Sequence, residues 1–169
     1  MRKKSKYRPR ALIYDTLNHV VSGMKVVGNI SAGTTLKIKN HAALESIRRG
    51  DGTRDDIDIL IDAFNITEAL ALMRIGNDWK DEIRAAQDAL LAVGRRGVET
   101  GKFILRGPEL TSFNLAMEVH DAQLDACTVS ELEKAIDFVT EIIRNKQARA
   151  VVQTEQSPRP ISDIEKVVL

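Results

Sequence analysis

The placement of proline is the feature that most constrains how this chain can fold. Proline occurs only at positions 9, 108, 158 and 160, so nothing between residues 10 and 107 forces a helix to break. Within that stretch apolar residues recur three and four apart, which is the repeat of one helix face. The clearest repeat comprises Ile57, Leu60, Ile61, Phe64, Ala71, Leu72 and Ile75. The pattern predicts a long amphipathic helix here and helices through most of the chain.

Glycines and capping residues set the expected ends of about six helices. We expect a short helix over roughly 11–23 and a second over 34–49, followed by helices that start near Thr53, Asn77, Gly107 and Thr128. Gly76 is expected to close the third helix, because glycine adopts the left-handed conformation of helix ends. Residues 102–106 are expected to form a brief extended link, and the last helix should fade near residue 152.

The arrangement of these helices follows from their short connections and from the composition. Short links make neighbouring helices antiparallel, which predicts an all-α bundle. The 169 residues suit one domain, and only seven are aromatic, so the core must be largely aliphatic. We therefore expect a flexible basic arm at residues 1–10, a helical bundle domain at 11–152 and a C-terminal tail at 153–169.

The basic residues of the chain are concentrated at its N-terminus. Six of the 25 Lys and Arg residues lie in the first ten positions, which leaves 19 against 24 acids in the rest. Extended basic arms contact phosphates, so this arm is a candidate nucleic-acid-binding segment. The alternatives are a solubilising terminus, or an arm held by the acidic faces at 55–62 and 118–125. The candidate residues are Arg2, Lys3, Lys4, Lys6, Tyr7, Arg8 and Arg10.

Cysteine content and hydropathy bear on the compartment. Cys127 is the one cysteine, so no intramolecular disulfide can form, and a cytoplasmic protein is expected. Asp15, Asn18 and His19 interrupt the segment after the basic arm, which therefore lacks the apolar core of a signal peptide. No apolar run approaches the ~18 residues of a membrane span. We expect no membrane partner.

Two loop-like motifs suggest ligand sites but depart from the patterns they resemble. Residues 51–62 place acids as a calcium loop does, yet Asp56 stands where the loop needs glycine. A capped helix with a solvated acidic face fits better. Residues 97–102 resemble a phosphate loop, but Arg96 and Phe103 occupy two required positions. We expect neither a metal nor a cofactor.

Of the three histidines, His120 is the one whose sequence neighbours best suit metal binding or proton transfer. It lies on the same helical stripe as Phe113, Met117 and Leu124, and the acids Glu118 and Asp121 are close in sequence. A buried histidine beside carboxylates can bind metal or transfer protons. A core histidine satisfied by a carbonyl or an acid is the more common arrangement and is the one we expect. We define His120, Glu118 and Asp121 as a candidate polar core site.

Three segments carry a resemblance to a known group of proteins. The arm from Arg2 to Pro9, the stretch LKIKNH at 36–41 and the stretch TRDDIDILIDAFN at 53–65 resemble small helical proteins encoded by bacteriophages and prophages. The resemblance extends to about residue 140. That group has no assigned activity, so it implies no site residues. It implies a phage accessory protein that acts in the host cytoplasm.

The sequence therefore predicts an interaction protein. The first hypothesis is a non-enzymatic phage protein that binds a host or phage protein assembly, as an inhibitor of bacterial immunity or as an adaptor. Its apolar ridges are also compatible with a homo-oligomer. The second is a nucleic-acid-associated protein that contacts DNA or RNA through the basic arm. The third and weakest is a metal or hydrolytic site around His120.

Overall fold

The computed structural model describes residues 30–145, 147, 149–150 and 167–168. In this part of the chain five α-helices carry nearly all the structure, which confirms the all-α prediction. They are α2 (Ile30–Arg49), α3 (Arg54–Leu72), α4 (Lys80–Thr100), α5 (Gly107–Ala126) and α6 (Val129–Arg144), with a 3-10 turn η2 (Asn77–Trp79) before α4. The expected helix over 11–23, the basic arm at 1–10 and the domain boundaries near residues 10 and 152 lie outside the described residues.

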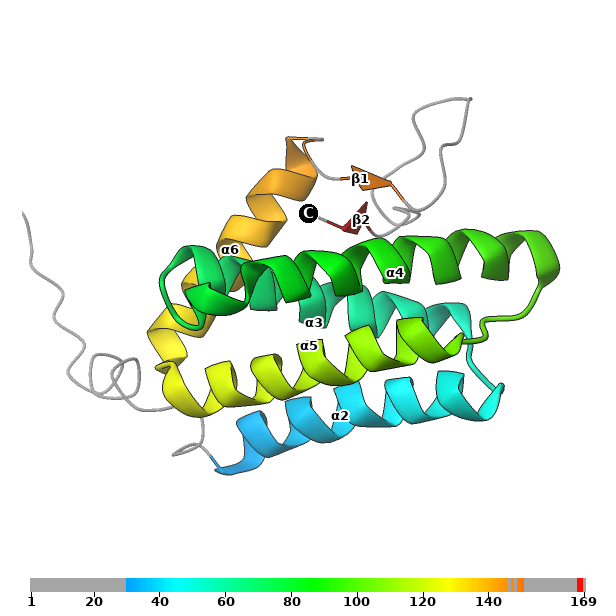
Figure 1. The fold of residues 1–169 in the computed structure, drawn as a ribbon. Coiled ribbons are helices and arrows are strands. Elements are labelled where there is room, and N and C mark those ends of the chain that lie inside the picture. Colours follow the sequence, from blue (N-terminus) through cyan, green and yellow to red (C-terminus); the bar gives the residue numbers. More distant parts are fainter. Residues whose placement is uncertain (1–29, 146, 148, 151–166, 169) are drawn as a thin grey trace, which may run out of the picture.

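Four of the helices form an up-and-down bundle, and the fifth lies across it (Figure 1). Helices α2, α3, α4 and α5 run side by side. Helix α3 packs against α2, α4 and α5, and α5 packs against α4 and, less extensively, against α2. Helix α6 packs chiefly on α3. Because α3 contacts every other helix, it is the centre of the fold.

Local chemistry fixes several helix ends as the sequence predicts. Thr53 caps α3 in a capping box with Asp56, and Thr128 caps α6 in the same way with Glu131. Pro108 lies in the first turn of α5, where its missing N–H costs no hydrogen bond. Gly50 ends α2 with a φ of 87°. These motifs are local, which explains why they are readable from sequence.

The end of α3 differs from the prediction, which placed it at Gly76. The helix ends at Leu72, and Arg74 adopts a left-handed conformation with a φ of 69°. The N–H of Arg74 donates to the Ala71 carbonyl and the N–H of Ile75 to the Leu70 carbonyl, which is a Schellman motif. An arginine therefore takes the position that glycine usually fills. A helix was expected to start near Asn77; Asn77 begins η2, and α4 follows at Lys80 with Trp79 as its N-cap.

Two further helix boundaries differ from the predictions. Helix α2 begins at Ile30 and continues through Gly33, because a glycine at a packed position is tolerated more readily than in an isolated helix. Helix α6 ends at Arg144, not near residue 152. The backbone beyond it is used in pairing instead, since β1 (Arg149–Ala150) forms an antiparallel ladder with β2 (Val167–Val168).

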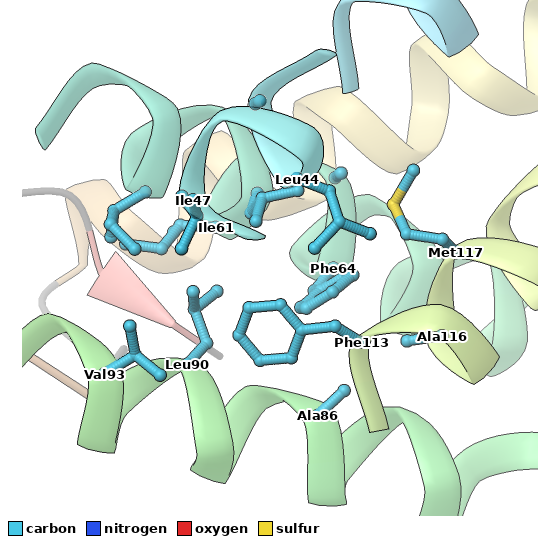
Figure 2. Packing of buried hydrophobic residues seen from close by; sticks show 14 of the residues in the cluster. Leu44, Ile47, Ile61, Phe64, Ala86, Leu90, Val93, Phe113, Ala116 and Met117 are labelled. Atoms are coloured by element: carbon cyan, nitrogen blue, oxygen red, sulfur yellow. The ribbon is translucent and has the colours of Figure 1, made fainter. Parts of the chain in front are cut away.

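The larger apolar cluster, which we call the Phe64 cluster, fills the space between α2, α3, α4 and α5 (Figure 2). Phe64 and Phe113 meet edge to face, with ring centroids 5.3 Å apart and an interplanar angle of 87°. Aliphatic side chains surround the two rings, as the low aromatic content predicts. The buried members include Leu44, Ile47, Leu60, Ile61, Ala86, Leu90, Val93, Ala116 and Met117.

A second cluster, which we call the Leu70 cluster, lies under α6. Its buried members are Ala69, Leu70, Leu124, Cys127, Ala135 and Val139. Leu36 from the start of α2 packs against it, together with Ile66, Ile75, Val129, Leu132 and Ile143. The two clusters occupy opposite ends of the bundle, because each of α2, α3 and α5 contributes residues to one cluster and then, farther along, to the other.

The link between α4 and α5 is extended at residues 102–106, as predicted. Phe103 forms an isolated antiparallel bridge with Gly52, which joins this link to the α2–α3 connection. Arg96 holds the start of α5 through a bidentate pair with Glu109, at 3.0 and 2.7 Å, and donates to the Ile104 carbonyl at 2.8 Å. Both connections at this end of the bundle are therefore tied to the helices.

Candidate functional site

Buried polar side chains separate the two apolar clusters. They come from α2, α3, α4 and α5, and all are almost fully removed from solvent. Asn40 and His120 lie between members of the two clusters along their helices, whereas Gln87 lies beside Ala86 of the Phe64 cluster. Such groups are costly in a core unless they are hydrogen-bonded, so their partners decide what the layer can do. We call this set the polar layer; it comprises Asn40, Asn65, Thr67, Gln87, His120 and Gln123.

His120 is at the centre of the polar layer and uses both ring nitrogens. Its Nδ1 lies 2.8 Å from the Thr67 hydroxyl oxygen, and its Nε2 lies 3.0 Å from the amide nitrogen of Asn40. The Thr67 hydroxyl proton is donated to the Ala63 carbonyl at 2.8 Å. Nδ1 therefore donates to Thr67, and Nε2 accepts from Asn40. The ring is neutral, and neither nitrogen is open to a ligand.

Burial also disfavours the charged form of this ring. The His120 side chain is fully buried, and this desolvation lowers its pKa from 6.5 to about 4. The negative charge of Asp121 opposes the shift, while His41 and Lys37 add to it. At neutral pH the ring is an uncharged hydrogen-bonding connector between three helices.

The two acids of the candidate site lie elsewhere. Glu118 is exposed on α5. Asp121 accepts a hydrogen bond from His41 Nε2 at 2.8 Å, and Asp125 pairs with Lys37 one turn farther along. These contacts tie α2 to α5 at the surface, next to the buried Asn40–His120 bond. The structure therefore separates His120 from Glu118 and gives Asp121 a different histidine as its partner.

Two glutamine amides complete the polar layer. The Gln123 amide nitrogen donates to the Thr67 carbonyl at 3.1 Å and to the Ile75 carbonyl at 2.7 Å, so it stabilises the chain where α3 ends. The Gln87 amide nitrogen donates to Glu68 at 3.0 Å, and Arg84 also contacts that carboxylate. The Gln123 bonds connect α5 to α3 and to Ile75, and the Gln87 bond connects α4 to α3.

The partners of His120 were missed because they lie far away in sequence. Asn40 and Thr67 are 80 and 53 residues from His120. A local signal did exist, since Asn40 falls between Leu36 and Ala43 on the buried stripe of its helix. A polar residue at a core position of a helical repeat indicates a buried hydrogen bond, although spacing alone does not identify the partner.

The two motifs with ligand-like spacing have structural roles. Asp56 occupies the capping box of α3, and its carboxylate also accepts from Ser46 at 3.0 Å. Gly97 lies within α4 against the Phe103 ring, where an added Cβ would come within 2.0 Å of Phe103 Cδ1. Among the described residues there is no group of three or more His, Cys, Asp or Glu side chains placed to hold a metal ion.

The described surface carries large exposed apolar side chains. Three of them lie at the end of α3 and in the connection that follows it, a region that we call the Trp79 corner: Leu72, Met73 and Trp79 are 48%, 36% and 45% exposed. Trp79 is the last residue of η2 and lies at the surface. Other exposed apolar residues are Ile38, Val98, Ile104, Ile136 and Phe138.

The helices and the comparisons with known proteins leave the class of protein open. Within the part of the chain that the structure describes, no helix is long and apolar enough to cross a membrane. No protein-family model, curated protein or solved structure matches the chain.

Proposed function

We propose that this protein is a non-enzymatic phage accessory protein that binds a host or phage protein assembly, as an inhibitor of bacterial immunity or as an adaptor. The phage setting follows from the resemblance of residues 2–9, 36–41 and 53–65 described above. The Trp79 corner is the observation that carries the binding role. It concentrates an exposed tryptophan, a leucine and a methionine within eight residues.

The chemistry of this corner suits a protein partner. Tryptophan is enriched among the residues that dominate binding energy at protein interfaces, and methionine adapts to irregular surfaces. The corner is also well supported, because the Schellman motif at Arg74 and the Gln123 bond to Ile75 hold its backbone. A preorganised apolar surface loses little entropy on binding.

The polar layer supports a binding role over a catalytic one. His120, the side chain with the greatest catalytic potential, is buried and is bonded to Thr67 and Asn40. A general acid or base needs a proton-transfer atom within reach of a substrate. His120 therefore connects α5 to α2 and α3 through hydrogen bonds.

Affinity capture from phage-infected cells tests this proposal. The wild-type chain should recover a reproducible protein partner, and Trp79→Ala should bind the purified partner about 30-fold more weakly, as expected for an interface hot spot. Val98→Ala is the matched control, because Val98 is similarly exposed on α4. Recovery of no partner above background, or equal binding by Trp79→Ala, would contradict the proposal.

The alternative function is nucleic-acid association through the basic arm, favoured by the six Lys and Arg residues in the first ten positions. Deletion of residues 1–10 should then abolish a salt-dependent shift of labelled DNA or RNA. The Trp79→Ala variant should leave that shift unchanged. The two variants therefore separate the protein-binding and nucleic-acid-binding hypotheses.

A further inference from the structure

Two apolar side chains of α6 lie outside the Leu70 cluster on one side of the helix. Phe138 is 40% exposed and Ile142, one turn farther along, is half-buried, and neither belongs to that cluster. At about 100° per residue they lie on one side of the line through Ala135 and Val139, a surface that we call the Phe138 edge. The α6 residues that pack in or against the Leu70 cluster lie along that line or on its other side; they are Val129, Leu132, Ala135, Val139 and Ile143.

The Phe138 edge also carries two opposite charges. Lys134 lies four residues before Phe138 and Glu141 three residues after it, and both are exposed. These spacings put each charge beside the ring on the helix surface. The two charged residues are about 10 Å apart along the helix axis, so the ring separates them. Among the residues that the structure describes, neither side chain has an ion-pair partner.

This order of groups is complementary to itself when the direction of the helix is reversed. In a two-fold symmetric pair the same surface is used by both molecules. An antiparallel pair of α6 helices centred near Phe138 would bring the two rings together and set Lys134 of each copy opposite Glu141 of the other. A parallel pair would instead place like charges side by side. Charge complementarity therefore favours a second copy of this chain, in the antiparallel orientation.

The other charges of α6 do not oppose this arrangement. Glu133, Asp137 and Arg144 are exposed, and each lies about 100° or more around the helix from Phe138. Glu131 is engaged with Thr128 in the capping box. Helix α6 packs chiefly on α3 and slants across the bundle, so the Phe138 edge lies at the periphery of the fold (Figure 1). A second molecule can reach it there.

We propose that the Phe138 edge is a self-association surface, on which a second copy of this chain docks antiparallel through paired Phe138 rings and reciprocal Lys134–Glu141 ion pairs. A single pair of helices buries less than the roughly 1,200 Å² of a stable interface. The dimer is therefore weak, with a Kd of about 100 µM. This inference does not depend on the Trp79 corner.

Sedimentation equilibrium of the full-length chain tests the proposal. The weight-average mass should rise from that of one 18.8 kDa chain toward twice that value as the concentration passes ~100 µM. Phe138→Ala should weaken association about tenfold, because it removes the central ring from both copies. Ile136→Ala is the matched control, since Ile136 is 43% exposed on the other side of α6, and it should leave association unchanged. A monomer up to about 1 mM, growth beyond two chains, or a dimer that Phe138→Ala weakens no more than Ile136→Ala would each overturn the proposal.

Charge exchange tests the antiparallel register. Lys134→Glu and Glu141→Lys should each weaken the dimer about tenfold, because each creates two like-charge contacts per dimer. The double variant Lys134→Glu/Glu141→Lys should restore wild-type association, since both pairs re-form with reversed polarity. Glu133→Lys changes a charge away from the edge and should have little effect, and circular dichroism checks that every variant keeps its helices. A double variant as weak as the single variants, or single variants that dimerise like the wild type, would contradict the proposed pairing.

Discussion

The Phe64 cluster and the Leu70 cluster share helices α2, α3 and α5, yet they are closed to different degrees. Four helices and an aromatic pair enclose the Phe64 cluster, and its connections are tied by Arg96 and the Gly52–Phe103 bridge. The Leu70 cluster is covered by α6, whose flanking residues Ile136 and Phe138 stay exposed. Regions with fewer buried contacts open at lower free energy. We therefore expect the end that contains the Leu70 cluster to open at lower free energy than the end that contains the Phe64 cluster.

The largest expected difference concerns core truncation. Phe113→Ala should lower the free energy of unfolding by about 4 kcal/mol, because it removes a fully buried ring and its contact with Phe64. Val139→Ala in the Leu70 cluster should cost about 2 kcal/mol, since it removes less buried surface. Urea unfolding followed by circular dichroism measures both. Equal losses would mean that Val139 stabilises the fold more than its smaller buried surface predicts.

The polar layer between the clusters should make stability depend on pH. Burial lowers the pKa of His120 to about 4 from 6.5, so between these values the unfolded chain binds a proton that the folded chain does not. Stability should therefore fall by about 3 kcal/mol as the pH drops from 6.5 to 4. Urea titrations across this range measure the slope.

Two histidine variants show whether the slope belongs to the buried ring. His120→Gln should remove most of this pH dependence, because the titrating group is gone. His41→Gln should retain it, since His120 keeps its partners Asn40 and Thr67. A slope that survives His120→Gln would assign the effect to other groups.

A smaller effect is expected at the tied end of the bundle. Gly97→Ala should destabilise the protein by about 2 kcal/mol, because its Cβ would overlap the Phe103 ring that packs on the Phe64 cluster. Gly107→Ala is the matched control, since nothing lies within 4 Å of its added Cβ. Thermal unfolding compares the two. If Gly97→Ala left the unfolding temperature unchanged, the Phe103 ring would have to shift without loss of stability, which contradicts tight packing at this end.

The smallest effect concerns the two threonine caps. Thr53→Ala and Thr128→Ala should each cost about 1 kcal/mol, because each removes one capping box. For Thr128→Ala we expect exchange to quicken about fivefold in α6 alone. For Thr53→Ala we expect a change in global stability, since α3 is the central helix. Hydrogen exchange by segment measures this, and a global response to both variants would remove the distinction between the two ends.

The sequence predicts those features of the fold that depend on neighbouring residues. Thr53, Pro108 and the Thr128–Glu131 pair mark helix starts by local hydrogen bonding and backbone preference, and the structure confirms them. The misplaced ends depend on distant contacts. Arg74 takes a left-handed conformation where Ile75 packs against the Leu70 cluster, and Arg149–Ala150 pair with Val167–Val168 beyond the end of α6.

The same distinction applies to the candidate site. The position of His120 on an apolar stripe was visible in the sequence, and the structure places it in the core. Its partners were not visible, because Asn40 and Thr67 reach it only once three helices have packed. Asp121 is adjacent to His120 in sequence, yet it points to His41. Proximity along a helix says little about which side chains meet between helices.

Cys127 gives this chain an intrinsic reporter of its less protected end. It is the one cysteine in the sequence, and its thiol is fully buried in the Leu70 cluster, 3.9 Å from the Leu124 carbonyl. A thiol reagent can reach it only when α6 separates from α3 or the whole chain unfolds. The labelling rate of the unmodified protein therefore reports whichever opening is more frequent, and a rate above that of global unfolding would measure the detachment of α6 without any engineered probe.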